Sequence, residues 1–350
     1  MSLMPLEVIL HVGLHKTATS TLQYHLSMLS KLLYDVGICF PAELGENHSV
    51  PLCVLADYKS DAYARKFEIR NIDSYNENTR FLLAESVDDN VKTLILSGES
   101  LSLLDASALE RLKLILLEIF PSRFLIFKIM VYVREPLSFL VSLAQQHIKS
   151  SGELALPNDL HNLFSNRIQK FIDVFGSDSV CVYKFEEAVK QEGNILEHFL
   201  TYVGAEGIHT AVRMNSRNVS LSQLAADLFL ELKKVKGKEF NRNRYKCLLE
   251  VKGERFDLDV SVKQRYIESF EQEVAWLKEK FDINYDKPVI LSNNVSLRAE
   301  TLEEEQIVSL KNVESKLKKD EWEIILSYLE RNYKGLSLQQ KRFFNIKRMF

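Results

Sequence analysis

Residues 8–23 read VILHVGLHKTATSTLQ, and they join an apolar run to an amphipathic one through a short polar turn. The apolar run predicts a buried strand. The segment after the turn carries leucines at helical spacing, which predicts a helix with one buried face: Leu22, Leu26, Leu29 and Leu33. A helix N-terminus presents unpaired backbone N–H groups and a partial positive charge. The turn is therefore predicted to be an anion-binding loop.

The side chains of this turn suit a phosphate group but not the common nucleotide-triphosphate loop. Lys16 supplies a full positive charge, and hydroxyl donors follow it at Thr17, Thr19 and Ser20. A Walker A loop has a glycine directly before its lysine. Here His15 holds that place, which disfavours a P-loop kinase but leaves it as an alternative enzyme.

A second informative segment begins at residues 124–133, a long run of apolar, β-branched and aromatic side chains that predicts a buried central strand. Arg134 follows directly, and Ser142 lies eight residues later within a helical pattern. Pro136 fits the first turn of that helix, where its missing N–H costs nothing. An arginine at a strand end is suited to bind a phosphate through two parallel hydrogen bonds.

Together, the two segments resemble the nucleotide motifs of sulfotransferases that use 3′-phosphoadenosine 5′-phosphosulfate (PAPS), especially bacterial and carbohydrate-type members. Those enzymes carry a His-Lys-Thr-Gly-Thr-Thr-like turn, and this chain has Ala18 where they usually have glycine. A helical backbone tolerates an alanine there, whereas a positive φ strains it. The resemblance implies that Lys16 stabilises the leaving group and that Arg134 and Ser142 hold the 3′-phosphate. The donor-binding set that it implies is Lys16, Thr17, Ala18, Thr19, Ser20, Arg134 and Ser142.

Three further segments resemble parts of the same family, so that the resemblance spans roughly residues 5–290. They are the Ser-x-Glu turn at 97–99, the strand with its Phe-Glu-Glu end at 180–187, and the Asn-x-Ser-Leu-Ser stretch within 214–222. The last of these and the His-Lys-Thr turn favour a carbohydrate as the acceptor.

The group that removes the acceptor's proton is predicted to be Glu99 or His15. The resemblance implies either type, because some members of the family use a histidine and several carbohydrate-type members a glutamate. Both residues also have structural interpretations: Glu99 pairing with a lysine or with loop N–H groups, and His15 shaping the loop. His11, within the first apolar run, is predicted to be a buried core histidine. Gln146 and His147 are additional candidates for the acceptor pocket.

Composition narrows the protein class. The chain has 350 residues, of which 46% are apolar, and a net charge of −3, which argues against a general nucleic-acid binder. Four cysteines without C-x-x-C spacing indicate reduced thiols rather than a zinc site or a disulfide framework. We find no membrane-spanning run and no signal-peptide pattern, and therefore expect a cytoplasmic protein. Sulfuryl transfer from PAPS needs no metal, and no metal-ligand pattern stands out.

Strands and helices alternate along the first two thirds of the chain. Strands are predicted at 6–12, 93–97, 124–133 and 179–183, and helices at 19–33, 105–119, 136–149, 160–175 and 195–203. This order indicates an α/β fold with a central, mainly parallel sheet flanked by helices, and the resemblance implies a P-loop-like version of it. Because ligands of such sheets bind beyond the carboxyl ends of the strands, we expect Lys16, Glu99 and Arg134 to share one crevice.

Two parts are expected: an α/β domain at 1–290 and a helical extension at 291–350 that packs on it and ends in a basic tail. The function implied is sulfuryl transfer from PAPS to a hydroxyl or amine of a small molecule or glycan. A nucleotide-binding protein with a degenerate site is the non-enzymatic alternative. The sequence pattern specifies no oligomeric state.

Overall fold

The computed structural model describes residues 4–14, 16–160, 163–208, 220–286 and 301–333. The chain forms two compact units. Unit 1 comprises Met1–Glu135, His161–Arg217 and Gln272–Tyr285, and unit 2 comprises Pro136–Leu160, Asn218–Glu271 and Asp286–Phe350. The boundary predicted at residue 290 lies outside the described residues and stays a prediction.

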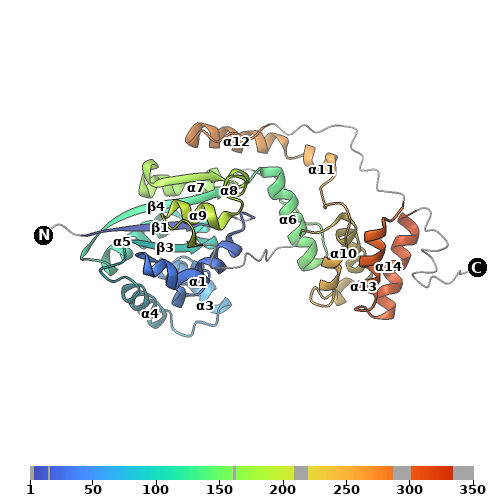
Figure 1. The fold of residues 1–350 in the computed structure, drawn as a ribbon, viewed down its shortest axis with the longest axis horizontal. Coiled ribbons are helices and arrows are strands. Elements are labelled where there is room, and N and C mark those ends of the chain that lie inside the picture. Colours follow the sequence, from blue (N-terminus) through green and yellow to red (C-terminus); the bar gives the residue numbers. More distant parts are fainter. Residues whose placement is uncertain (1–3, 15, 161–162, 209–219, 287–300, 334–350) are drawn as a thin grey trace, which may run out of the picture. The chain divides into compact units, whose positions relative to one another are not determined.

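Unit 1 is built on a five-stranded sheet whose paired strands are all parallel (Figure 1). The strand order is β2-β3-β1-β4-β5. The strands are β1 Met4–Val12, β2 Ile38–Cys39, β3 Thr93–Gly98, β4 Arg123–Val133 and β5 Val180–Lys184. The predicted α/β class is confirmed. Four of the strands match predicted ones to within two residues, and β2 was not predicted.

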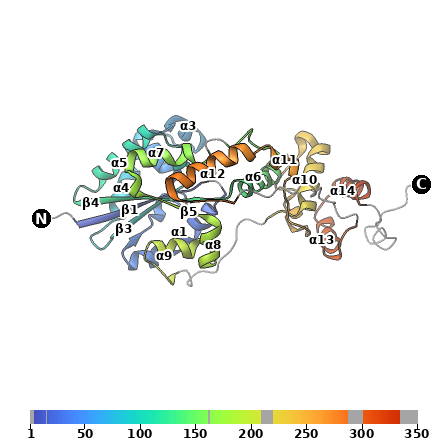
Figure 2. The same ribbon diagram turned by 90° about the horizontal axis from the view of Figure 1, so that it is seen from above.

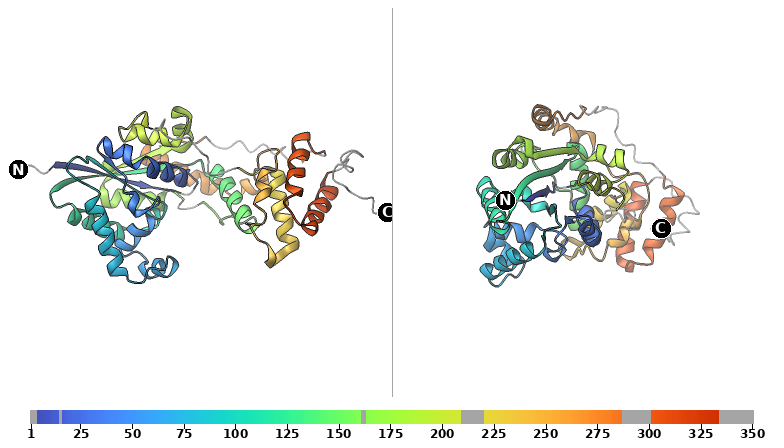
Figure 3. Two further views of the ribbon diagram at one scale, coloured as in Figure 1. Left: turned by 60° about the horizontal axis from the view of Figure 1, so that its bottom comes forward. Right: turned by 60° about the vertical axis from the view of Figure 1, so that its left-hand side comes forward.

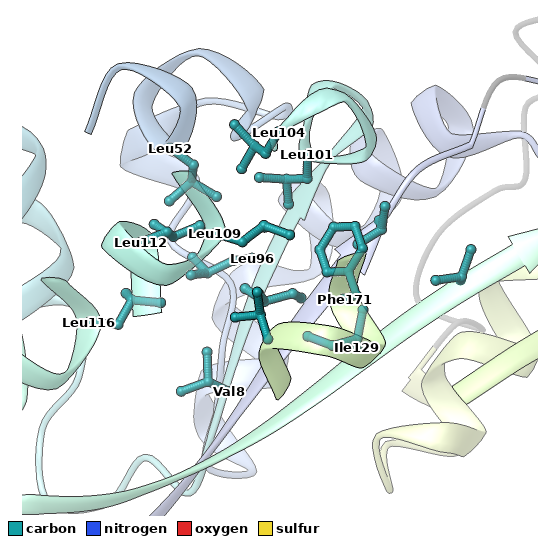
Figure 4. Close-up of a cluster of buried hydrophobic side chains, with 14 of the residues drawn as sticks. Val8, Leu52, Leu96, Leu101, Leu104, Leu109, Leu112, Leu116, Ile129 and Phe171 are labelled. Carbon is teal, nitrogen blue, oxygen red and sulfur yellow. The ribbon is translucent and has the colours of Figure 1, made fainter. Parts of the chain in front are cut away.

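Helices cover both faces of this sheet because its strands carry apolar side chains on both sides. Figure 2 shows α5 (Ala106–Ile119) and α7 (Ser165–Phe175) on one side, with α1 (Thr19–Asp35) and α9 (Ile195–Tyr202) on the other. In β1, Val8 and Leu10 pack toward α5 and α7, whereas Ile9 packs toward α1 and α9. Figure 4 shows the first of these cores, which contains Val8, Leu52, Leu96, Leu101, Leu104, Leu109, Leu112, Leu116, Ile129 and Phe171.

The region between β2 and β3 is helical, although the sequence patterns predicted no element there. It contains α2 (Ser49–Leu55), α3 (Ser60–Lys66) and α4 (Ile72–Glu85). A short 3₁₀ helix, η2 (Glu99–Leu103), follows β3 directly, and α8 (Phe185–Glu192) follows β5. The helix predicted at 160–175 begins only at Ser165. Helix α12 (Ile267–Phe281) contributes its second half to unit 1.

Unit 2 is helical. Figure 3 shows α6 (Pro136–Ser151), in green, and the orange-red helices α13 (Glu304–Glu314) and α14 (Lys319–Asn332) around α10 (Gln223–Lys236), in yellow. Unit 2 also contains the short helix α11 (Val260–Gln264), the first residues of α12 and two 3₁₀ helices, at Gly237–Glu239 and Lys246–Glu250. Helices α10 and α14 bury Leu228, Phe229 and Leu329, and the Tyr328 hydroxyl on α14 donates to Asp227 Oδ2 at 2.9 Å. In the described part of the chain, no helix combines the length and apolarity needed to cross a membrane.

Candidate functional site

The loop after β1 has the backbone geometry of an anion cradle. Lys16 has a φ of 70° and Ala18 a φ of 56°, whereas Thr17 between them is not in the left-handed region. Backbone that alternates in this way turns successive N–H groups toward one concave side, which attracts anions. Helix α1 begins at Thr19, so its N-terminal N–H groups and dipole add to the positive potential.

Ala18 could have a helical backbone, which suits an alanine, or a positive φ, which strains it. The structure shows the positive φ. Ala18 is the N-cap of α1, with φ 56° and ψ 23°, in the left-handed region. Its carbonyl accepts hydrogen bonds from the N–H groups of Thr21 and Leu22, both at 3.0 Å, so the conformation is tied to the start of the helix. An alanine in this region costs roughly 1 kcal/mol relative to glycine, because its Cβ crowds the backbone.

Two of the predicted donor-binding hydroxyls shape the loop itself. Thr17 and Thr19 are buried. Thr17 Oγ1 donates to the Leu14 carbonyl at 2.8 Å, and Thr19 Oγ1 lies 3.3 Å from Thr17 Oγ1. Ser20 is exposed and Lys16 is half-buried, whereas His15 lies outside the described residues. Of the predicted hydroxyls in the loop, Ser20 is thus the most open to solvent.

Gly13 allows the loop to close tightly against the start of α1. A Cβ at this position would lie 2.4 Å from Thr19 Cγ2 and 3.2 Å from Glu99 Cα. The Gly13 N–H donates to the Gly98 carbonyl at 3.2 Å. The same contacts place Glu99, the first residue of η2, beside the beginning of the loop.

Arg134, at the end of β4, contacts the loop directly. Its Nη1 donates to the Lys16 carbonyl at 2.9 Å. The guanidinium also lies 5.6 Å from the centre of the Phe185 ring, and its Nε is 4.0 Å from Glu186 Oε1. The structure therefore brings Lys16, Glu99 and Arg134 to the carboxyl ends of the three adjacent strands β1, β3 and β4. Their chemical roles stay predictions.

Glu186 is a member of this edge that sequence reasoning did not single out as a site residue. Its Oε1 accepts from the Glu135 N–H at 3.1 Å, and its Oε2 lies 3.5 Å from the Tyr285 hydroxyl. The same hydroxyl donates to the Val133 carbonyl at 3.1 Å. Burial raises the pKa of Tyr285, and the Glu186 charge raises it further. Tyr285 therefore stays protonated and fixes the carboxylate beside Arg134.

A buried polar network lies beneath the loop. Ser97 on β3 is its centre: its hydroxyl lies 2.7 Å from His11 Nδ1, and Gln23 Nε2 donates to its carbonyl at 3.2 Å. The Ser97 N–H donates to His48 Nδ1 at 3.1 Å, so the proton of the neutral His48 ring is on Nε2. Burial lowers the pKa of His11 to about 3 and that of His48 to about 4. The network is thus uncharged at neutral pH and ties β1, β3 and α1 together.

Two cations on α7 lie against η2, and sequence reasoning missed both. Lys170 Nζ donates to the Ser102 carbonyl at 2.7 Å. Burial and, to a smaller extent, the neighbouring Arg167 charge lower the pKa of Lys170 to about 8. Their i, i+3 spacing is visible in the sequence, but it does not reveal which element they face.

Ser142, Gln146 and His147 lie on α6 in unit 2. Ser142 and His147 are half-buried, and Gln146 is exposed. Sharing of a phosphate between Ser142 and Arg134 stays a prediction. Across the described ranges, no group of three or more His, Cys, Asp or Glu side chains is arranged to hold a metal ion.

The chain was compared with family models, curated proteins and solved structures. No protein-family model matches the chain. No curated protein matches it either. Among solved structures, the chain is similar to a sulfotransferase from Alicyclobacillus acidocaldarius, with 15% identity and a TM-score of 0.36 over 76% of this chain and 98% of that one. Similarity this low does not show a shared activity.

Proposed function

We propose that this protein is a sulfotransferase that moves a sulfuryl group from PAPS to a hydroxyl or amine. The observation that carries the proposal is the hydrogen bond from Arg134 to the Lys16 carbonyl. It joins the two segments that resemble the nucleotide motifs of that family, although they are 118 residues apart in the chain. Two positive side chains at one loop suit a ligand with several phosphate groups.

The residues of the site fit such a donor. The backbone N–H groups of the loop and the N-terminus of α1 are suited to bind the 5′-phosphosulfate end. Ser20 adds an exposed hydroxyl. The Arg134 guanidinium is proposed to bind the 3′-phosphate, because its planar shape suits a phosphate group. Ser142 is the second residue that the resemblance assigns to that phosphate.

The proposed reaction is an in-line displacement. PAPS supplies a sulfuryl group that is joined to its 5′-phosphate through a bridging oxygen. The acceptor oxygen forms a bond to sulfur while the bond from sulfur to the bridging oxygen breaks. Lys16 stabilises the negative charge that develops on the leaving phosphate oxygen. Glu99, beside the loop, accepts the proton of the acceptor hydroxyl. A carbohydrate acceptor is proposed from the resemblance alone.

Isothermal titration calorimetry with 3′-phosphoadenosine 5′-phosphate, the product nucleotide, tests the donor site. We expect the native protein to bind it and Arg134→Ala to bind it at least about tenfold more weakly, since a charged hydrogen bond to phosphate is lost. Arg80→Ala is the matched control, because Arg80 pairs with Glu118 at the surface of the same unit. Equal affinity in Arg134→Ala and the native protein would contradict the assignment of Arg134.

Two further assays on the native protein distinguish the proposed function from the two alternatives, a P-loop kinase and a nucleotide-binding protein with a degenerate site. Magnesium-dependent hydrolysis of ATP without binding of the adenosine bisphosphate would indicate a P-loop kinase. Binding of the bisphosphate without transfer of radiolabelled sulfate to any component of a glycan extract would indicate a nucleotide-binding protein with a degenerate site. Labelled products, identified by mass spectrometry, would support the proposed function and name the acceptor.

A further inference from the structure

The pairing of β4 with β5 ends directly before Arg134. The last matched pair of the two strands is Val133 with Lys184. Arg134 comes next, and its Nη1 donates to the Lys16 carbonyl at 2.9 Å. An arginine side chain has many rotamers, so one that lies beyond the paired strands needs contacts of its own to keep a single conformation.

Two side chains hold the backbone on either side of Arg134. Glu186 Oε1 accepts from the N–H of Glu135, the residue after Arg134, at 3.1 Å. The Tyr285 hydroxyl donates to the carbonyl of Val133, the residue before it, at 3.1 Å. The same hydroxyl lies 3.5 Å from Glu186 Oε2, so the two anchors also contact each other.

The Glu186 carboxylate contacts the guanidinium as well as the backbone. Its Oε1 lies 4.0 Å from Arg134 Nε, and the Arg134 side chain is only 19% exposed, so water screens this pair weakly. A carboxylate at the edge of an anion-binding loop repels a phosphate group. Any benefit of Glu186 to such a site must therefore come through the arginine.

We propose that Glu186, itself anchored by Tyr285, is a positioning residue that holds the Arg134 guanidinium ready for a phosphate group at the anion-binding loop. The proposal rests on the proposed function, because it concerns the residue assigned there to the 3′-phosphate. A side chain that is held before the ligand arrives loses less rotamer entropy on binding. Glu186 thus acts through Arg134 and not through contact with the nucleotide.

Isothermal titration calorimetry with 3′-phosphoadenosine 5′-phosphate tests this role. Glu186→Ala is expected to weaken binding at least about fivefold. Glu186→Gln is expected to weaken it less, but at least about twofold, because an amide oxygen still accepts from the Glu135 N–H. Glu187→Ala is the matched control: it removes an equal charge from the next residue, which pairs with Lys184 at the surface, and is expected not to weaken binding.

A double-mutant cycle separates positioning from a general loss of structure. If Glu186 acts through Arg134, the double variant with Arg134→Ala and Glu186→Ala binds as weakly as Arg134→Ala alone. If Glu186→Ala does not fold, Glu186→Gln takes its place in every comparison. Unchanged or tighter binding in the Glu186 variant, or a further loss when it is added to Arg134→Ala, would overturn the proposal.

An NMR measurement without nucleotide distinguishes failure of this proposal from failure of the proposed function. In protein labelled with ¹⁵N-arginine, the Nε–H signal that disappears in Arg134→Ala belongs to Arg134. Its exchange with water is expected to be at least about fivefold faster in Glu186→Ala and unchanged in Glu187→Ala.

The two measurements together give distinct outcomes. Faster exchange in Glu186→Ala without any binding of the adenosine bisphosphate by the native protein would sink the proposed function but keep the positioning role. Binding by the native protein with an unchanged exchange rate in Glu186→Ala would do the reverse.

Discussion

Ala18 and Lys16 are the two described loop residues that have a positive φ although neither is glycine. The left-handed conformation of Ala18 is required by the hydrogen bonds that start α1, and glycine adopts that conformation without strain. Ala18→Gly is therefore expected to raise the free energy of unfolding by about 0.5–1 kcal/mol, after the larger chain entropy of glycine is allowed for. Urea unfolding followed by circular dichroism measures the change.

Ala62 provides the matched control for this prediction. It lies exposed within α3, where the backbone is helical. Ala62→Gly is expected to lower the free energy of unfolding by about 0.5–1 kcal/mol, because glycine is the poorer helix former. If both substitutions destabilise the protein equally, Ala18 is not strained in solution.

The buried histidines predict how stability depends on pH. The folded pKa of His11 is about 3, against 6.5 for an exposed histidine. Below pH 6.5 the unfolded chain takes up a proton that the folded protein does not. The free energy of unfolding therefore decreases as the pH is lowered from 6.5 to about 3. From pH 7 to 5.5 this residue alone is expected to lower it by about 1.2 kcal/mol. His48, with a folded pKa of about 4, acts in the same direction.

Urea unfolding of native protein and His11→Gln at these two pH values measures the contribution. The native protein is expected to lose about 1.2 kcal/mol more than the variant between pH 7 and 5.5, whatever the variant's stability at pH 7. An identical loss in both would show that His11 is protonated in the folded state at the lower pH.

At the scale of elements, the N-terminus of α7 depends on one carboxylate from another helix. Glu273 accepts three hydrogen bonds there, and the first residues of α7 supply no side-chain cap of their own. Glu273→Ala is expected to lower the free energy of unfolding by about 2–3 kcal/mol, because it leaves buried N–H groups without an acceptor. Gln272→Ala, exposed on the same helix, is expected to change it by less than about 0.5 kcal/mol. Thermal unfolding of both variants measures these changes. Similar losses of stability in the two variants would refute the capping role of Glu273.

Helices and strands were predicted correctly where the spacing of apolar residues within the element itself indicates its type. Most of β1, all of β3 and the second half of β4 are buried on both faces, so these strands are apolar runs that stand out without any knowledge of neighbours. Helices α2 and α3 were missed because they are only seven residues long. A helix of two turns shows too little periodicity to be distinguished from a loop. Helix α4 has 14 residues but buries only Thr79 and Leu83, so its sequence carries no clear apolar stripe.

At the scale of the whole molecule, the division of the chain into two units predicts which unit a bound nucleotide stabilises. Unit 1 carries Lys16, Glu99 and Arg134, so the adenosine bisphosphate is expected to stabilise unit 1. At a concentration about 100-fold above its Kd, the gain is about 2.7 kcal/mol, which corresponds to a rise of several degrees in Tm. Differential scanning calorimetry with and without the nucleotide measures it. Adenosine without phosphates is expected to give no rise, and the absence of a rise with saturating bisphosphate would argue against the site.

The sequence by itself determined the α/β class, four of the five strands and the position of the polar loop before α1. Each of these follows from the spacing of apolar and polar residues over a short stretch of sequence, because that spacing determines whether the stretch forms a strand, a turn or a helix. Only the tertiary structure decided that Arg134 binds the carbonyl of Lys16 and that the Thr17 hydroxyl turns back to the Leu14 carbonyl. The strand order β3-β1-β4 places β1 beside β4 and so creates the first of these contacts. The contact between Arg134 and Lys16 joins residues 118 apart in the chain, and no local periodicity encodes such a pairing.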